Sequence, residues 1–433
     1  MDIDAALLRY KGYGKGFSII ERQIDLPEGN FINSVIGPRR AGKTFFMLQC
    51  KNSIDLPDSN KIFINAEDID LEGITSHDLD KLEEAMFSVY SPDRGKAILL
   101  FIDEVQNLPS WGRWLRTLAD ERIYKIIISG STSVLSTDKL PDELRGRAIN
   151  TIVLPFSFSE YCSAKDVIYS DRMRPEEAGA VVSAFRDYLE YGGYPLVVEA
   201  KTPELKAFML RELYETVLQR DIIEKHRIRK PNVLRAFINT AMGSACRVVS
   251  APALSSWFTN QGTKLSDQAA ANYLAYAQDV FLFFFLYQYS RRPKQRNVKP
   301  RLYLPDSGLL EMAGADTAKK LENHVFAELM RRGKRISYLA SPEIDFVVES
   351  GRGIEELIQV SYSIEDPGAY AREAKALTEA AGALKCRRLK IITFNEEKKL
   401  KIGRYAIEVI PAWKWMLSLP APRSLTQRPR SRA

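Results

Sequence analysis

The chain has 433 residues, of which 45% are hydrophobic and 27% are charged, and its formal net charge is +7. These values are typical of soluble globular proteins and exclude a fibrous, collagen-like or wholly disordered chain. At roughly 100–200 residues per domain, the length predicts two to four domains. The longest apolar run, near Val280–Leu286, is much shorter than the ~18–20 residues of a membrane span, and the N-terminus lacks a signal-peptide pattern. We therefore expect a cytoplasmic protein with no membrane partner.

The cysteines indicate neither a zinc site nor a disulfide framework. They form no C-x-x-C pair, and the chain has only three histidines to accompany them. A reducing compartment is the expected environment. The four are Cys50, Cys162, Cys246 and Cys386.

The excess of positive charge is concentrated in three segments. Arg291–Arg301 holds six Lys or Arg residues and no acid, and Lys225–Lys230 holds five basic positions when His226 is counted. The tail Pro420–Ala433 has four Arg and no acid, and we expect it to be disordered. Such clusters favour a polyanion such as nucleic acid as partner, although a solvated surface would give the same pattern.

Short apolar runs alternate with amphipathic stretches between Phe31 and Leu154. The apolar runs predict strands buried on both faces, and the stretches with apolar residues at helical spacing predict helices. The expected strands are Phe31–Ile36, Lys61–Asn65, Ala97–Ile102, Ile123–Ile128 and Ile149–Leu154, and the expected helices are Phe45–Ser53, Leu79–Tyr90 and Trp111–Ala119. Strand–helix alternation of this kind predicts a parallel sheet with helices on both faces.

The middle of the chain is predicted to be mostly helical. Ser157–Lys225 is helical except at Gly192-Gly193-Tyr194-Pro195. After it, three helices and a pair of strands joined by the basic segment 291–301 follow the order of a winged helix-turn-helix. The three helices are Val233–Met242, Ala251–Phe258 and Ser266–Val280, the last with Ser266 and Asp267 as capping residues.

The C-terminal part predicts a separate small α/β unit. Its expected elements are a helix at Leu321–Met330, a hairpin of Glu343–Val348 and Leu357–Tyr362, a helix at Tyr370–Ala381 and a strand at Leu389–Phe394.

A complete phosphate-binding pattern, G-x-x-x-x-G-K-[ST], lies between the first predicted strand and its helix. The glycines let backbone N–H groups surround phosphate oxygens, and the helix N-terminus adds the positive end of its dipole. In this pattern Lys43 reaches the β- and γ-phosphates and the Thr44 hydroxyl binds Mg²⁺. The residues predicted to bind the nucleoside triphosphate are Gly37, Pro38, Arg39, Arg40, Ala41, Gly42, Lys43 and Thr44.

A second motif supports the first. The buried strand Ala97–Ile102 ends in Asp103-Glu104, and a carboxylate at the C-terminal end of a parallel strand points toward the ligand. We predict that Asp103 holds the magnesium ion and that Glu104 orients and activates the attacking water. The two motifs together predict a site that hydrolyses a nucleoside triphosphate.

Two further groups are candidates for catalysis. The strand Ile123–Ile128 ends in hydroxyl residues, of which Ser129 or Ser131 would sense the γ-phosphate. Arg145 and Arg147 are candidates for an arginine finger, or each pairs with a surface acid.

With these motifs the chain resembles the archaeal and bacterial P-loop ATPases of the AAA+ superfamily that carry a winged helix and a C-terminal domain of uncharacterised function. The resemblance covers most of the chain. It extends over GPRRAGKT, LLFIDEVQNLPSWGRWLRTL, ISGSTSVLS…LRGR, LPFSFSEY, YLEYGGYP, LQRDIIEKHRIR, LENHVFAEL and EIDFVV…LIQVSYS. It implies ATP and Mg²⁺ as cofactors and a P-loop strand beside the Asp-Glu strand. It also implies that Gly193-Tyr194-Pro195 contacts the adenine region through Pro195, whereas the residues alone fit a helix-terminating turn equally well.

The C-terminal unit of this family is similar to the PD-(D/E)xK nuclease fold, whose chemistry needs two acids around Mg²⁺ and a lysine that activates water. Glu322 and Asp345 match the acidic positions, but the expected acid-x-Lys is Gln359-Val360-Ser361. The resemblance therefore implies an inactive remnant that binds nucleic acid or protein, unless Lys375 takes the lysine's role.

The motifs, the predicted elements and the family resemblance together predict five segments. They are a P-loop core over 1–160, a helical lid over 161–226, a winged helix over 227–304, a nuclease-like unit over 305–418 and a basic tail over 419–433. The fold class is an α/β P-loop NTPase with a winged helix and a restriction-endonuclease-like domain.

The leading functional hypothesis is a Mg²⁺-dependent ATPase coupled to duplex DNA. The third helix of the winged helix would enter the major groove and the basic wing would contact phosphates. Its candidate DNA-binding residues are Arg291, Arg292, Lys294, Arg296, Lys299 and Arg301. That helix is rich in apolar residues, so a signalling switch that binds a protein partner or forms a homo-oligomer stays open, as does an active nuclease.

Overall fold

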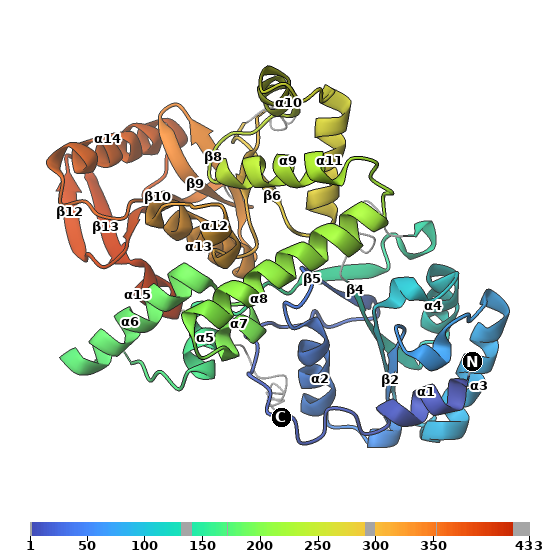
Figure 1. Cartoon of the computed structure of the whole chain (residues 1–433). Helices are drawn as coiled ribbons and strands as arrows, with labels where there is room; N and C mark the ends of the chain where they lie inside the picture. Colours follow the sequence, from blue (N-terminus) through green and yellow to red (C-terminus); the bar gives the residue numbers. More distant parts are fainter. Residues whose placement is uncertain (1, 131–140, 171, 291–298, 352, 419–433) are drawn as a thin grey trace. The chain divides into compact units, whose positions relative to one another are not determined.

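The computed structural model describes residues 2–130, 141–170, 172–290, 299–351 and 353–418. They belong to two compact units, Met1–Val153 and Leu154–Pro420, each of which is described by itself (Figure 1). Within these described ranges, no helix has the length and apolar character needed to cross a membrane.

The first unit is built on a parallel sheet with the strand order β2-β3-β4-β1-β5. Every residue of β3 is buried, as expected for an inner strand covered on both faces. The strands are β1 Ile32–Ile36, β2 Lys61–Asn65, β3 Ile98–Asp103, β4 Tyr124–Gly130 and β5 Ala148–Ile152.

Four helices flank this sheet. They are α1 Ile3–Tyr10, α2 Lys43–Ser53, α3 Leu79–Tyr90 and α4 Trp111–Asp120. Helices α1 and α3 contact each other near β2, and α2 packs on the sheet, as Figure 1 shows. The core between α2 and the sheet contains Phe46, Met47, Phe63, Phe101 and Ile127, each at most 4% exposed.

The structure confirms the parallel sheet but corrects its strand order. The expected neighbour of the P-loop strand was the Asp-Glu strand, whereas β4 lies between β1 and β3 and pairs with both. The last expected strand is also shorter and less buried, since β5 ends at Ile152 and forms an edge of the sheet. Strand neighbours depend on long-range pairing, which the pattern of one strand does not encode.

The second unit begins with helices. Ser157 caps the first of them in a reciprocal capping box with Glu160. These helices are α5 Phe158–Ala164, α6 Pro175–Tyr191, α7 Pro195–Glu199 and α8 Pro203–Thr216, and a π-helical segment, Val217–Glu224, follows directly.

Three helices and a strand pair come next, in the predicted order. Ser266 caps the third helix by accepting a hydrogen bond from the Ala269 N–H. The elements are α9 Pro231–Gly243, α10 Ala251–Asn260, α11 Asp267–Asp279, β6 Phe284–Leu286 and β7 Arg301–Tyr303, and the two strands pair antiparallel.

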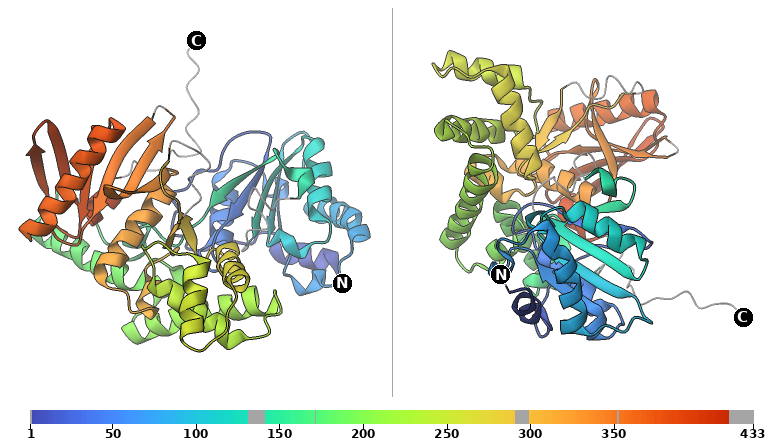
Figure 2. Two further views of the ribbon diagram at one scale, coloured as in Figure 1. Left: turned by 90° about the horizontal axis from the view of Figure 1, so that it is seen from above. Right: turned by 90° about the vertical axis from the view of Figure 1, so that its right-hand side faces the viewer.

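The rest of the second unit is a six-stranded mixed sheet in the order β12-β13-β11-β10-β9-β8. The sequence predicted the hairpin β9–β10, the following helix and β11, but not β8, β12 or β13. The strands are β8 Arg335–Ala340, β9 Glu343–Ser350, β10 Gly353–Val360, β11 Leu389–Thr393, β12 Lys398–Ile402 and β13 Tyr405–Pro411. The helices are α12 Gly308–Met312, α13 Thr317–Arg331, α14 Pro367–Leu384 and α15 Ala412–Leu417. Figure 2 shows α14 lying along this sheet, where it contacts β9, β10 and β11.

Candidate nucleotide-binding site

The P-loop of the first unit has a backbone that only glycine permits at its first position. Gly37 has φ 148°, and a Cβ atom there would lie 2.2 Å from the Val153 carbonyl oxygen. Gly42, with φ 96°, is the N-cap of α2 and has no side chain with which to cap the helix. A helix N-terminus without a side-chain cap, at the positive end of the helix dipole, suits an anion.

Lys43 lies within this loop and is only 6% exposed. Its Nζ atom donates hydrogen bonds to the carbonyl oxygens of Gly37, at 3.1 Å, and Pro38, at 3.0 Å. The ammonium group is therefore held over the loop that the sequence predicts to bind phosphate.

Asp103 joins the P-loop helix to the ends of two strands. One carboxylate oxygen, Oδ2, accepts a hydrogen bond from the Thr44 hydroxyl at 2.6 Å, and the other accepts one from the Ser129 hydroxyl. Ser129 Oγ in turn accepts from the Glu104 N–H at 3.1 Å. Burial raises the pKa of the Asp103 carboxyl, and the hydrogen bonds from Ser129 and Thr44 partly oppose that rise. Three separate sequence motifs thus meet in one polar cluster.

The donor set of this cluster fits a magnesium ion. Thr44 and Asp103 present two hard oxygen atoms 2.6 Å apart at the N-terminus of α2. Magnesium is usually held by one or two carboxylates together with substrate phosphates and waters, and not by a cage made of protein alone.

Glu104 follows β3 in a left-handed backbone conformation, with φ 51°. Its carboxylate Oε2 accepts a hydrogen bond from Gln106 Nε2 at 2.6 Å. Its backbone N–H is tied to Ser129, so the residue is anchored at the same edge of the sheet as the P-loop. The other candidate hydroxyl, Ser131, lies outside the described residues.

Arg147 does not reach this site within one chain. The Ile32 N–H donates to the Arg147 carbonyl at 2.8 Å, at the start of β1, whereas the P-loop leaves the other end of that strand. A strand rises about 3.3 Å per residue, so roughly 13 Å separates the start of β1, beside Arg147, from its other end, where the P-loop begins. Both candidate arginines form ion pairs, Arg145 with Asp142 at 3.0 Å and Arg147 with Asp120.

Sequence reasoning missed an aromatic pair beside the phosphate site. Phe45 directly follows Thr44 and is 46% exposed, and Phe17 is 45% exposed with its ring centroid 6.1 Å from that of Phe45. Gln49 holds the N-terminal segment against α2, since its side chain bonds the Arg22 N–H at 2.7 Å and the Arg22 carbonyl at 3.1 Å. The sequence shows an aromatic residue, Phe45, directly after Thr44, but the exposure of both rings and their contact are visible only in the structure.

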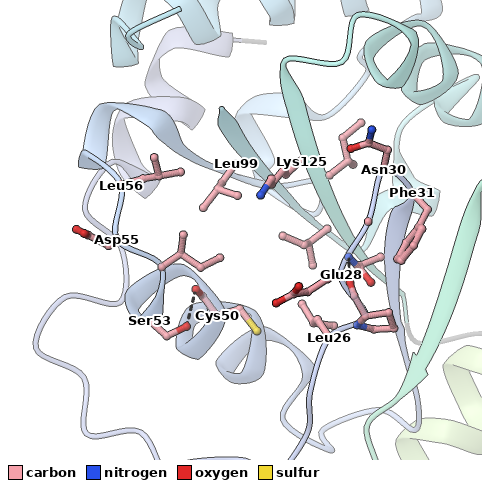
Figure 3. A pocket seen from close by; sticks show the side chains of 16 residues that line it. Leu26, Glu28, Asn30, Phe31, Cys50, Ser53, Asp55, Leu56, Leu99 and Lys125 are labelled. Atoms are coloured by element: carbon pink, nitrogen blue, oxygen red, sulfur yellow. Dashed lines mark hydrogen bonds between the residues drawn. The ribbon is translucent and has the colours of Figure 1, made fainter. Parts of the chain in front are cut away.

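A pocket of about 1090 Å³ lies at the opposite edge of the sheet from the P-loop. It is lined by the segment before β1, the C-terminal end of α2 and the first residues of β3 and β4, including Leu99 and Lys125 (Figure 3). The side chains that line it are mostly apolar. Its position separates it from the phosphate-binding residues.

Pro195 belongs to the second unit, where it is the first residue of α7. The preceding Gly193 donates its N–H to Asp306 Oδ2 at 2.8 Å and accepts a hydrogen bond from the Phe156 N–H at 2.8 Å. The Asp306 carboxyl is fully enclosed, and burial raises its pKa to about 6. These contacts are those of a helix-terminating turn, and the adenine contact of Pro195 stays a prediction.

The candidate DNA-binding residues divide into three groups. Arg291, Arg292, Lys294 and Arg296 lie outside the described residues. Lys299 is exposed, as predicted. Arg301 corrects the prediction, since it is 6% exposed and its guanidinium faces Asp345 and Glu343 instead of solvent. All three residues of β7 are buried, so both faces of this strand are covered, which the basic composition of the segment does not reveal.

The residues predicted from the nuclease fold do lie close together in the second unit. The Asp345 N–H donates to Gln359 Oε1 at 2.8 Å, and Arg301 lies within 3.7 Å of Glu322. Lys375 is not among them, because its side chain is 76% exposed and pairs with Glu379. The lysine required by this type of nuclease is therefore not supplied from α14.

Comparison with known protein families identifies an AAA domain that lies mostly in the first unit. A family described as "AAA domain" matches residues 29–162, and one described as "Domain of unknown function (DUF8612)" matches residues 182–319. An uncharacterized protein of Methanocaldococcus jannaschii is 31% identical over 424 residues, which cover 93% of this chain and 92% of that protein. This chain belongs to the same family, and it carries an AAA domain.

Two further proteins are similar to this chain. An uncharacterized protein of Haemophilus influenzae is 28% identical over 360 residues, covering 80% of this chain and 86% of that protein. Among solved structures, the Walker-type ATPase PABY2304 of Pyrococcus abyssi is similar over 66% of this chain and 91% of its own, with 16% identity and a TM-score of 0.45. Proteins similar to this chain thus occur in an archaeon and in a bacterium.

Proposed function

We propose that this AAA-domain protein is a Mg²⁺-dependent ATPase. The observation that carries the proposal is the chain of hydrogen bonds from Thr44 through Asp103 to Ser129 and Glu104, next to the glycine-shaped P-loop. It joins a phosphate-binding loop, a metal-binding pair and a candidate base at one edge of the sheet.

In the proposed reaction, ATP places its β- and γ-phosphates on the N-terminus of α2, where Lys43 turns from the loop carbonyls to the phosphate oxygens. Thr44 and Asp103 would hold magnesium, which when bound neutralises phosphate charge. Glu104 orients a water and accepts its proton as the water oxygen bonds to the γ-phosphorus. The bond to the β–γ bridging oxygen breaks, and ADP and phosphate are released. Ser129 fixes the orientation of Asp103.

The exposed pair of Phe17 and Phe45 offers a place for the nucleobase. Phe45 is one residue from the proposed magnesium ligand Thr44, and both rings are nearly half exposed. A flat aromatic ring binds any base by stacking, which agrees with a site that contains no base-reading motif.

Replacing Phe45 by alanine is expected to weaken ATP binding about 5- to 150-fold, because base–aromatic stacking contributes roughly 1–3 kcal/mol. The rate of hydrolysis at saturating ATP should change little, since the ring does not touch the γ-phosphate. Titration of a fluorescent ATP analogue measures the dissociation constant. Phe208→Ala on α8, where the ring is 58% exposed, is the matched control. Equal affinity of Phe45→Ala and the unaltered protein would contradict this base site.

We also propose that Arg145 and Arg147 act on the nucleotide of a neighbouring copy in a homo-oligomer. Arg147 lies at the end of β1 away from the P-loop. Both side chains form exposed ion pairs that are weak and easily exchanged. An arginine supplied in trans stabilises charge that develops on the transferred phosphoryl group.

The ATPase is proposed to couple to duplex DNA through a winged helix formed by α9–α11, β6 and β7. The order of these elements supports this, together with the exposed Lys299 and the basic composition of the segment 291–301. Because Arg301 is buried, five of the six candidate cations remain to contact DNA phosphates. The wing therefore has less phosphate-binding charge than its sequence suggests. We retain the boundaries 161–226, 227–304 and 305–418 as proposed domains, with the last one nuclease-like and inactive.

Phosphate release from ATP and Mg²⁺, measured with and without duplex DNA at low salt, tests this coupling. We expect DNA to raise the rate, and we expect the effect to fade between about 50 and 200 mM salt, as phosphate contacts do. Glu104→Gln is the control, because it should lack turnover in both conditions. A rate that DNA leaves unchanged would contradict the coupling.

The apolar character of α11 favours a second candidate. Ala270, Leu274 and Ala277 of this helix are buried, and Asp267–Asp279 contains no Lys or Arg. A helix without positive charge suits a protein partner better than a phosphate backbone. In this case the chain is an ATP-dependent assembly switch. Light scattering that rises with ATP, without a gel shift on DNA, would favour it.

A further inference from the structure

The second unit contains a buried arginine surrounded by acids. Arg301, on β7, is 6% exposed and reaches three carboxylates from two other elements. Its Nη1 atom lies 3.1 Å from Asp345 Oδ1 and 3.7 Å from Glu322 Oε1, and its Nη2 atom lies 2.5 Å from Glu343 Oε1. The guanidinium also lies over the ring of Tyr338, 4.7 Å from its centroid. A permanent positive charge thus sits where α13 and β9 bring their acids together.

Two acids of this cluster, Glu322 and Asp345, accept further hydrogen bonds from the protein. The Tyr303 hydroxyl donates to Glu322 Oε1 at 2.6 Å, and the Val360 N–H donates to Asp345 Oδ2 at 2.9 Å. Burial raises the pKa of both carboxyls, their mutual repulsion adds to the rise for Glu322, and Arg301 opposes it for both.

The side-chain amide of Gln359 forms hydrogen bonds through both its oxygen and its nitrogen. Its oxygen accepts from the Asp345 N–H at 2.8 Å, and its nitrogen donates to Glu373 Oε2 at 2.5 Å. The residue that replaces an acid of the nuclease pattern is therefore part of the internal hydrogen-bond network, with its carbonyl oxygen turned to the backbone.

These contacts do not fit the magnesium ion that the nuclease resemblance implies. A metal between Glu322 and Asp345 would need carboxylate oxygens facing an open position, and the guanidinium of Arg301 occupies that position. Among the residues described, no group of three or more His, Cys, Asp and Glu side chains is arranged to hold a metal. Arginine presents five N–H donors, so it serves several carboxylates at once without losing its charge.

We propose that Arg301 is the resident cation of this acidic cluster, so that the native second unit holds no divalent ion between Glu322 and Asp345. The same contacts fasten β7, the second strand of the proposed wing, to β9 of the six-stranded sheet. A second contact ties the start of this segment to the same sheet, because the Tyr338 hydroxyl on β8 donates to the Lys299 carbonyl at 2.6 Å. Nucleic-acid phosphates are not the partner of Arg301, since they would have to compete with three carboxylates already within 3.7 Å.

The proposal predicts that a divalent ion can replace the arginine. In Arg301→Ala the acids lose their counter-charge, and breaking a buried ion pair in this way should lower the melting temperature by about 6–20 °C. Millimolar Mn²⁺ should raise the melting temperature of Arg301→Ala and give one bound ion by electron paramagnetic resonance. Arg301→Ala/Asp345→Asn should lack this response. Arg335→Ala, which removes an arginine on β8 whose side chain is 70% exposed, should respond to Mn²⁺ as the unaltered protein does.

All measurements use the full chain without nucleotide, so this inference and the proposed ATPase can fail separately. The response of the unaltered protein to Mn²⁺ sets the baseline for any ion at the P-loop. A folded Arg301→Ala that ignores Mn²⁺ would overturn the proposal. If Arg301→Ala does not fold, Asp345→Asn alone decides the question. It should match the unaltered protein in Mn²⁺ binding, and loss of a bound ion in Asp345→Asn would show that the native cluster holds a metal.

Discussion

Replacing Glu104 by glutamine is expected to lower the rate of ATP hydrolysis by about 10²–10⁴-fold while ATP still binds, because a positioned general base contributes a factor of that size. Glutamine keeps the size of the side chain and its link to Gln106, but it cannot take a proton from water. The backbone N–H of residue 104 still donates to Ser129, so the Thr44–Asp103–Ser129 cluster should persist.

Single-turnover phosphate release and nucleotide titration separate the two effects. Glu121→Gln is the matched control, since Glu121 is exposed at the end of α4, near the edge of the sheet away from the P-loop. Unchanged turnover in Glu104→Gln would remove this residue from the reaction. Loss of both binding and turnover would instead indicate that Glu104 supports the shape of the site.

Replacing Lys43 by alanine should abolish detectable ATP binding at micromolar nucleotide, a loss of at least about 10- to 100-fold in affinity. One charged hydrogen bond to phosphate contributes roughly 1.5–3 kcal/mol, and Lys43 has two donors directed at the loop in the absence of nucleotide. The same substitution frees the carbonyl oxygens of Gly37 and Pro38, which water can then satisfy.

Calorimetric titration with ATP and Mg²⁺ measures this loss, and the melting temperature without nucleotide tests whether the fold survives. Lys125→Ala is the control, because Lys125 is an exposed lysine at the opposite end of the sheet. ATP binding of normal strength in Lys43→Ala would contradict a phosphate site at this P-loop.

The contrast between the two acidic clusters shows how neighbours set function. Asp103 meets two hydroxyl groups and keeps its oxygens near the end of α2, which suits a metal and a phosphate. Asp345 meets the guanidinium of Arg301 and a backbone N–H, which leaves no room for either. Both residues are aspartates, but only Asp345 has the positive charge of an arginine beside it.

The sequence alone determined the P-loop, the Asp-Glu strand and the parallel sheet, because each depends on residues that are adjacent or periodic along the chain. Gly37 and Gly42 are required by local backbone angles, and the buried run of β3 is visible in its composition. The hairpin β9–β10 and the capped helix α11 follow from similarly local signals.

Only the tertiary structure decided which distant segments meet. It placed β4 between β1 and β3, put Arg147 at the start of β1, away from the P-loop, and brought Phe17 beside Phe45. It also turned Arg301 away from solvent, although its segment is among the most basic of the chain. Strand order, burial and ion pairing arise from contacts across tens to hundreds of residues, and one strand's pattern holds no information about its eventual neighbours.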